Sequence, residues 1–204
     1  MKKRLHVLKT LVILTAIFSL FNCNPVEKDT KSASMLIVED LTGTDVEGNM
    51  SNFLQSDVIK LDSSTGQGTV FADIARATFT ARLLDPSATA SSQYNSIQLT
   101  RYVVTYTRSD GKNKQGVDVP YSFEGSLSTL VEIGAHETVS FVIVRAVAKL
   151  EPPLVDLTYP RGEEGELKVT AQIDFYGRDL ANRNVKATGY LTIYFANYTD
   201  ETEG

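Results

Sequence analysis

The sequence predicts an all-β protein, a two-sheet antiparallel β-sandwich of about eight or nine strands. Three observations lead to this fold class. Apolar and polar residues alternate strictly over residues 167–175 and again over 185–195, as they do in strands with one buried face. Clusters of turn-forming residues recur at nearly regular intervals. No segment after residue 35 shows a sustained helical period of apolar residues.

Two short strands are expected first, at 35–41 and 57–61, with turn-forming residues at 43–52 between them. After a second turn cluster at 63–68, a long strand is expected at 69–84. Its apolar residues recur at period two and should face inward: Phe71, Ala75, Ala77, Phe79, Ala81 and Leu83. The alanines also suit a helix, but the segment ends without a helical stop signal, which favours the strand.

The middle of the chain continues this pattern. Polar, turn-rich connections are expected at 85–95, 109–111 and 151–165, and strands at 97–108, 117–123 and 127–133. Residues 138–150 are apolar on both faces, which predicts a strand in the centre of a sheet.

The last two strands carry the clearest alternation. The first should bury Leu167, Val169, Ala171, Ile173 and Phe175, and the second Val185, Ala187, Leu191, Ile193 and Phe195. Residues 177–184 between them form a predicted hairpin loop. Each strand therefore has one face for a core and one for solvent.

The middle of the chain, residues 69–150, resembles an immunoglobulin-like or fibronectin type III domain. Tyr102-Val103-Val104-Thr105-Tyr106, followed by Asp110-Gly111, is similar to the third strand and turn of that family, and residues 139–148 to its long later strand. The chain departs from the family pattern in lacking tryptophan and in having two long strands after residue 150. The resemblance implies an architecture and no particular chemistry.

The N-terminus predicts export. Residues 1–9 carry Lys2, Lys3, Arg4 and Lys9, and residues 11–21 are apolar except for Thr15 and Ser19. This run is shorter than the roughly 20 residues of a spanning helix and has the character of a secretory signal.

Leu20-Phe21-Asn22-Cys23 closes this run and holds the only cysteine of the chain. It resembles the lipobox of bacterial lipoproteins, with leucine three residues before the cysteine, although Phe21 and Asn22 replace the usual small residues. The resemblance implies a signal peptide at 1–22, lipid attachment at Cys23, a flexible tether to residue 34 and a folded domain at 35–204. Asn24 in place of aspartate favours the outer membrane over the inner membrane of the cell envelope.

Composition narrows the classes of partner. Cleavage before Cys23 would leave 16 Lys and Arg against 25 Asp and Glu, a net charge of −9 (16 − 25). Such a chain repels nucleic acid. A length of 182 residues (204 − 22) suits one domain with a substantial core, and the domain is expected to be monomeric.

No catalytic or cofactor motif emerges. The mature chain has a single histidine, His136, expected in an exposed turn, and no Gly-x-Ser-x-Gly sequence. Gly66 and Gly68 precede a strand, so they do not suit a nucleotide loop. Two groups of mostly acidic residues have a functional alternative to simple hydration: Asp40, Asp45, Glu47 and Asn49 could serve as calcium ligands, and Glu163, Glu164 and Glu166 as catalytic carboxylates. Hydration is favoured for both, and the chain is interpreted as a non-enzyme without metal or cofactor.

Tyrosines mark the one candidate binding face. On the last strand Tyr190, Tyr194 and Tyr198 should share the outward side, where Tyr176 of the preceding strand could join them. Exposed rings can stack on sugars or anchor a protein partner, but tyrosines also stabilise sheets by themselves. We therefore expect a lipid-anchored binding or structural module of the envelope with a protein or glycan partner. A carbohydrate-binding or adhesive module is the second hypothesis, and an envelope enzyme with an unrecognised site the third.

Overall fold

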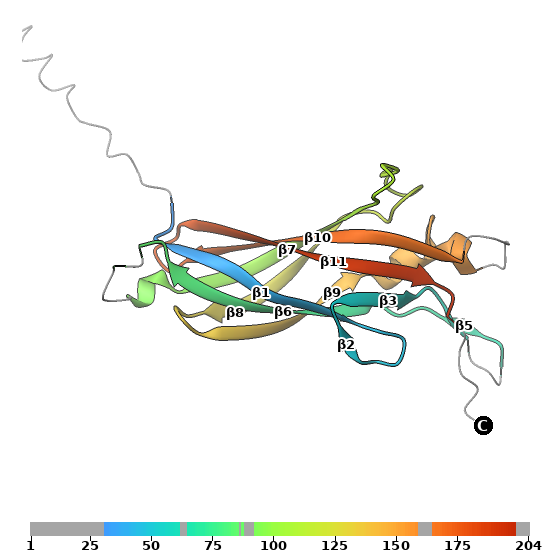
Figure 1. The fold of residues 1–204 in the computed structure, drawn as a ribbon, viewed down its shortest axis with the longest axis horizontal. Coiled ribbons are helices and arrows are strands. Elements are labelled where there is room, and N and C mark those ends of the chain that lie inside the picture. Colours follow the sequence, from blue (N-terminus) through green and yellow to red (C-terminus); the bar gives the residue numbers. More distant parts are fainter. Residues whose placement is uncertain (1–30, 62–64, 86, 88–91, 159–164, 199–204) are drawn as a thin grey trace, which may run out of the picture. The chain divides into compact units, whose positions relative to one another are not determined.

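The computed structural model describes residues 31–61, 65–85, 87, 92–158 and 165–198 (Figure 1). The predicted signal peptide, Cys23 and most of the tether lie outside these residues. Residues Lys31–Gly204 form one compact unit. In the described ranges the chain contains strands and short 3₁₀ turns but no α-helix, and we find no helix there that could cross a membrane.

Two sheets pack against each other. The first holds four strands in the order β2 (Met50–Ser51), β1 (Ser34–Thr44), β6 (Asp73–Leu83) and β9 (His136–Val144). The second holds five in the order β3 (Phe53–Asp57), β11 (Asn184–Ala196), β10 (Glu166–Asp179), β7 (Ile97–Thr107) and β8 (Phe123–Val131). A small ribbon pairs β4 (Lys60–Leu61) with β5 (Gly68–Thr69), and three 3₁₀ turns lie at η1 (Gln93–Asn95), η2 (Ala146–Leu150) and η3 (Val155–Thr158).

The core lies between the two sheets. Four of its rings interlock edge to face: Phe79 and Phe141 from the first sheet each contact Phe175 of the second, and Tyr102 contacts Phe141. All the residues predicted to be inward on β10 are buried, as are four of the five on β11. Burying each large apolar side chain contributes about 1.5–3 kcal/mol, so this core dominates the stability of the fold.

The prediction of an all-β protein with packed sheets is confirmed, and two of its details are wrong. The described residues hold eleven strands rather than eight or nine. The sheets are not purely antiparallel either, because β3 pairs in parallel with the second half of β11. The strands also bend strongly along their length (Figure 1).

Several predicted strand limits need correction. The strand expected at 69–84 begins at Asp73, and Phe71, expected inside, is 59% exposed. The strands expected at 117–123 and 127–133 are replaced by the single strand β8, because residues 114–119 close a hydrogen-bonded turn. Pairing of β3 with β11 places the second short strand at Phe53–Asp57 instead of 57–61.

The segment 138–150 is not a central strand. β9 ends at Val144 and lies at the edge of its sheet, and residues 146–150 form η2. A shift in strand register explains why the segment is apolar on both faces. The neighbouring residues Asp73 and Ile74 of β6 pair with Val144 and Val142, so β9 has one residue more than β6 at this point. The extra residue, Ile143, forms a β-bulge that lets Ile143 and Val144 both be buried.

The folded domain includes residues before 35. Ser32 and Ser34 are buried, and the Ser32 hydroxyl donates a hydrogen bond of 2.7 Å to Asp179 at the end of β10. We call this end of the sandwich, where β1 begins, the tether end. The opposite end, with the β7–β8 loop and the turns η2 and η3, is the far end (Figure 1).

Candidate functional site

The predicted tyrosine face is the outer face of the five-stranded sheet. Tyr190 and Tyr194 alternate with buried residues along β11, and Tyr176 does so along β10. Register places Tyr176 opposite Lys186, Tyr190 opposite Gln172 and Tyr194 opposite Lys168. Neighbouring rings lie four positions apart along the strands, which is a distance of about 13 Å. The three rings therefore form a row and not a cluster.

The ring of Tyr176 is in contact with neighbouring charged side chains. The Arg101 guanidinium lies 3.9 Å from the centre of its ring, and the Lys186 ammonium lies 5.4 Å from it. Lys186 also forms an ion pair of 2.9 Å with Asp174. Arg101 covers one face of the ring through a cation–π contact, so Tyr176 has little ring surface left for a ligand.

Tyr194 and Tyr198 are also engaged within the chain. The Tyr194 ring meets Phe53 edge to face at 5.8 Å, and the Lys168 ammonium lies 5.2 Å from its centre. Tyr198 lies beyond the end of β11, and its hydroxyl donates to the Tyr194 carbonyl at 3.4 Å. Burial, aided by the negative charge of Glu166, raises the pKa of Tyr198 to about 12.

Tyr190 differs from the other three because it is 62% exposed. It lies before the pairing with β3 begins, since the first residue of β11 in that parallel pair is Thr192, opposite Phe53. Among the four predicted residues, Tyr190 is thus the one that offers a large free ring surface.

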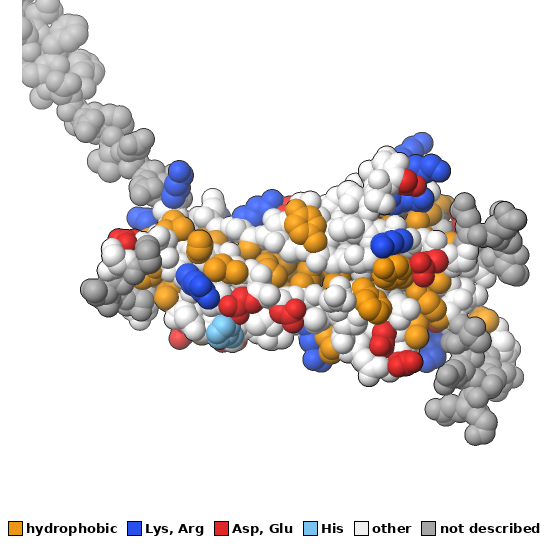
Figure 2. Space-filling view, viewed as in Figure 1, with side chains coloured by type: hydrophobic (Ala, Val, Ile, Leu, Met, Phe, Trp, Pro, Cys, Tyr) orange, Lys and Arg blue, Asp and Glu red, His pale blue; other side chains and the backbone are white. Residues whose placement is uncertain are grey.

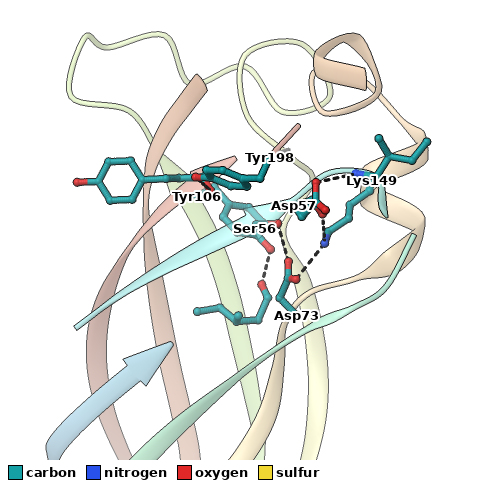
Figure 3. Close-up of polar contacts among 9 residues, drawn as sticks. Ser56, Asp57, Asp73, Tyr106, Lys149 and Tyr198 are labelled. Carbon is teal, nitrogen blue, oxygen red and sulfur yellow. Dashed lines mark hydrogen bonds and ion pairs between the residues drawn. The ribbon is translucent and has the colours of Figure 1, made fainter. Parts of the chain in front are cut away.

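A second set of polar residues gathers inside the far end (Figure 3). The Lys149 ammonium donates to the Asp57 carbonyl at 2.7 Å and to the Asp73 carboxylate at 2.9 Å. The Ser56 hydroxyl donates to the other Asp73 oxygen at 2.6 Å. We call Ser56, Asp73 and Lys149 the buried triad; it joins β3, β6 and η2.

The buried triad has the residue types of a nucleophilic site, but its accessibility argues against catalysis. Ser56 is 0% exposed, and the Lys149 side chain is 2% exposed. No substrate can reach an oxygen or nitrogen at these depths without opening the fold. Burial raises the pKa of Asp73, although Lys149 and Ser56 both oppose that shift. The arrangement is therefore that of a structural link between three chain segments.

A cavity of about 890 Å³ opens at the far end, between the β7–β8 loop, η3 and the start of β10. Its lining mixes both signs of charge: Arg108, Lys112 and Lys168 against Asp110, Asp118, Asp156 and Glu166. Two of these, Arg108 and Asp110, pair with each other at 2.7 Å. Apolar groups such as Val117 and Leu157 complete the walls, so charged and apolar side chains lie side by side in the cavity.

The remaining predicted candidates are scattered. His136 begins β9, is mostly exposed and contacts Glu39. Asn49 donates to the carboxylates of Asp45 and Glu47, so these oxygens are already hydrogen-bonded. Within the described ranges no group of three or more His, Cys, Asp or Glu could hold a metal ion. Glu163 and Glu164 lie outside the described residues, whereas Glu166 lines the cavity.

Sequence reasoning missed both the buried triad and the cavity. A lysine inside the apolar run 141–150 was a signal for the triad, because a buried ammonium needs a partner. The sequence holds no comparable signal for the cavity, since its walls come from three separate segments of the chain. Comparison of the chain with protein-family models, curated proteins and solved structures found no match.

Proposed function

We propose that this chain is a lipid-anchored, non-catalytic binding or structural module of the bacterial cell envelope, built on an immunoglobulin-like sandwich. Leu20-Phe21-Asn22-Cys23 supports the anchor. The burial of Ser56 and Lys149 supports a role without catalysis, because the chain's nearest approach to a nucleophilic set is out of reach of substrate.

The strand order supports the immunoglobulin-like part of the proposal. β1, β6 and β9 follow the order A, B and E of that fold, and β11, β10, β7 and β8 follow G, F, C and C′. The parallel strand β3 beside β11 takes the place of a first strand that switches sheets. In this assignment β7, which carries Tyr102 to Tyr106, would be the third strand, which agrees with the resemblance.

One observation carries the functional part: the sandwich has two different ends. The chain enters at the tether end, where Ser32 bonds to Asp179. The cavity and its loops lie at the far end (Figure 1). A lipid at Cys23 would hold the first end at the membrane and present the second to the periplasm or the cell exterior. The far end is where a partner would meet the module.

The anchor is tested by partitioning between detergent and water. The chain with its natural Cys23 should enter the detergent phase and sediment with outer-membrane fractions. Cys23→Ala should yield an unprocessed precursor or a water-phase protein, because no thiol remains to be acylated. A processed Cys23→Ala protein in the detergent phase would contradict the proposal.

A carbohydrate-binding or adhesive role is the second candidate, and the exposed ring of Tyr190 favours it. A glycan array should then show binding that Tyr190→Ser removes. Tyr94→Ser is the matched control, because Tyr94 is 59% exposed and lies on η1, away from the sheet face. Equal binding by both variants would reject the tyrosine face as a sugar site.

A further inference from the structure

We propose that the tether end is itself a membrane-contact surface, on which Leu84, Tyr94 and Leu180 enter the bilayer interface and nearby basic side chains bind lipid phosphates. This inference rests on the proposed lipid anchor and adds a second contact with the same membrane. The occupant of the surface is the phospholipid bilayer.

The three apolar side chains project from one end of the fold. Leu84 is 54% exposed, Tyr94 59% and Leu180 46%. A series of hydrogen bonds places them at the same end. The Leu84 amide donates to the Ala33 carbonyl at 2.9 Å, and the neighbouring Ser32 hydroxyl donates to Asp179 at 2.7 Å. The Leu180 amide, next to Asp179, donates to the carbonyl of Ser96, two residues after Tyr94, at 3.1 Å. Leucine and tyrosine on loop tips suit the bilayer interface, where apolar bodies sink in and polar tips stay wet.

Basic side chains surround these tips. Lys31 and Arg178 are exposed, and Arg183 lies beside Lys31, to whose carbonyl it donates at 3.2 Å. Figure 2 shows hydrophobic and basic side chains side by side at the end where β1 begins, on the left. The mature chain as a whole would be strongly acidic, so this end stands out as a place that can approach phosphates.

The acidic residues at this end do not outnumber the basic ones, and one of them is buried. Asp179 is 3% exposed and accepts hydrogen bonds from the Ser32 hydroxyl and the Arg183 amide. Asp85 and Glu132 are the exposed acidic residues near these tips among those described. The exposed basic residues Lys31 and Arg178, with the half-buried Arg183, therefore face two exposed acidic residues.

The length of the tether limits how far the tether end can move from the membrane. Cys23 and Lys31 are eight residues apart, a reach of at most about 28 Å when fully extended. As a flexible coil the same segment spans roughly 16 Å. Strand β10 holds 14 residues and is about 46 Å long, so a lipid at Cys23 brings the tether end to the bilayer and leaves the far end well away from it.

The experiment uses the acylated full chain in vesicles of phosphatidylethanolamine and phosphatidylglycerol. Acylated Cys23 does not react with a maleimide, so a single added cysteine can carry an environment-sensitive fluorophore. Ala181→Cys places the reporter on the β10–β11 turn, and Lys112→Cys places the control on the β7–β8 loop; both residues are exposed. Lipids with a spin label near the headgroup quench a reporter that lies at the interface.

We expect strong quenching at residue 181 and none at residue 112. Adding Leu84→Asp and Leu180→Asp should reduce quenching at residue 181 to the level of the control. The matched pair Val147→Asp and Leu150→Asp, at exposed apolar positions of the far end, should leave it unchanged. Equal quenching at residues 181 and 112, or no response to the tip substitutions, would overturn the proposal.

Failure of the anchor is distinguished by a second measurement on the unacylated chain, Cys23→Ser. At high lipid concentration this chain should still bind the same vesicles weakly in a flotation assay, and Leu180→Asp should weaken that binding about tenfold. Weak binding by Cys23→Ser, together with a natural chain that carries no acyl group at Cys23, would reject the lipoprotein while supporting the surface. Acylation without any contribution from Leu180 would do the reverse.

Discussion

Replacing Lys149 by methionine tests whether the buried triad links the far end. The substitution keeps the length and much of the volume of the side chain but removes the ammonium, which bonds Asp73 at 2.9 Å and the Asp57 carbonyl at 2.7 Å. The Asp73 side chain is only 16% exposed, so its carboxylate would lose its charged partner in a largely dry site. Removing one member of such a pair costs about 3–5 kcal/mol.

That loss is a large part of the ~5–15 kcal/mol that stabilises a typical domain. For a chain of this size it corresponds to a fall in Tm of about 6–20 °C. Thermal and urea unfolding of the purified chain measure both quantities. Lys112→Met, at an exposed position of the β7–β8 loop, is the control and should change stability by less than about 0.5 kcal/mol.

The pH dependence adds an independent check. Burial raises the pKa of Asp73 above its ordinary value of 3.8, so the folded state holds that proton more tightly than the unfolded state. Stability tied to this group therefore rises as the pH falls toward 3.8 and is lost as the pH rises through the folded-state pKa. In Lys149→Met the ammonium no longer opposes the shift, and the deficit of the variant should shrink in acid.

A double-variant cycle completes the test. Asp73→Asn in the Lys149→Met background removes the unpaired charge and should restore part of the stability, so the two changes are not additive. If Lys149→Met unfolds like the natural chain at neutral pH, the triad contributes nothing. A strictly additive cycle would likewise refute a direct link between Lys149 and Asp73.

Three further predictions follow from the fold and the tyrosine face. Ile173→Asp or Phe195→Asp should abolish folding, because both side chains are 0% exposed and an unpaired buried carboxylate costs several kcal/mol. Thr192→Asp on the outer face should be nearly neutral. Far-UV circular dichroism separates these outcomes, and equal tolerance of all three substitutions would mean that the inner and outer faces are misassigned. Tyr176→Ser should lower the free energy of unfolding by about 1 kcal/mol, since Arg101 loses its ring; a neutral result in urea titration would show that this contact is not stabilising. Tyr190→Ser should leave the melting temperature almost unchanged, and a large fall would identify Tyr190 as part of the sheet's own packing.

Alternation predicted the last two strands well because each has one face in the core and one in solvent. On β10 every second residue from Leu167 to Phe175 is buried. Such a pattern fixes which side chains point inward without any knowledge of the neighbouring strands. It also identified the outward side of Tyr190 and Tyr194 correctly.

The pattern failed where the backbone leaves regular pairing. Ile143 and Val144 are both buried because of a bulge, and such a bulge is indistinguishable in sequence from a central strand. Phe71 lies two residues before β6 begins and is therefore outside the alternation that includes Phe79. The parallel pairing of β3 with β11 left no signal in the sequence, because five residues cannot specify their neighbour.

The contacts of the candidate site residues could not be predicted from the sequence for a different reason. Lys149 lies 76 positions from Asp73 and 92 from Asp57, and their meeting depends on strand order and register. The same holds for Arg101 over Tyr176, which become neighbours only because β7 pairs with β10. The side of the sheet that a side chain faces can thus be predicted from its own strand, whereas the residues that it contacts depend on which strands pair and in which register.

The central proposal, that Cys23 tethers this sandwich to a membrane, is tested most directly by mass spectrometry of the protein extracted from the membranes of the cells that produce it. The account predicts that the mature chain begins at Cys23 and carries fatty acyl groups on that residue. A chain that still begins at Met1, or that begins elsewhere with an unmodified Cys23, would contradict it.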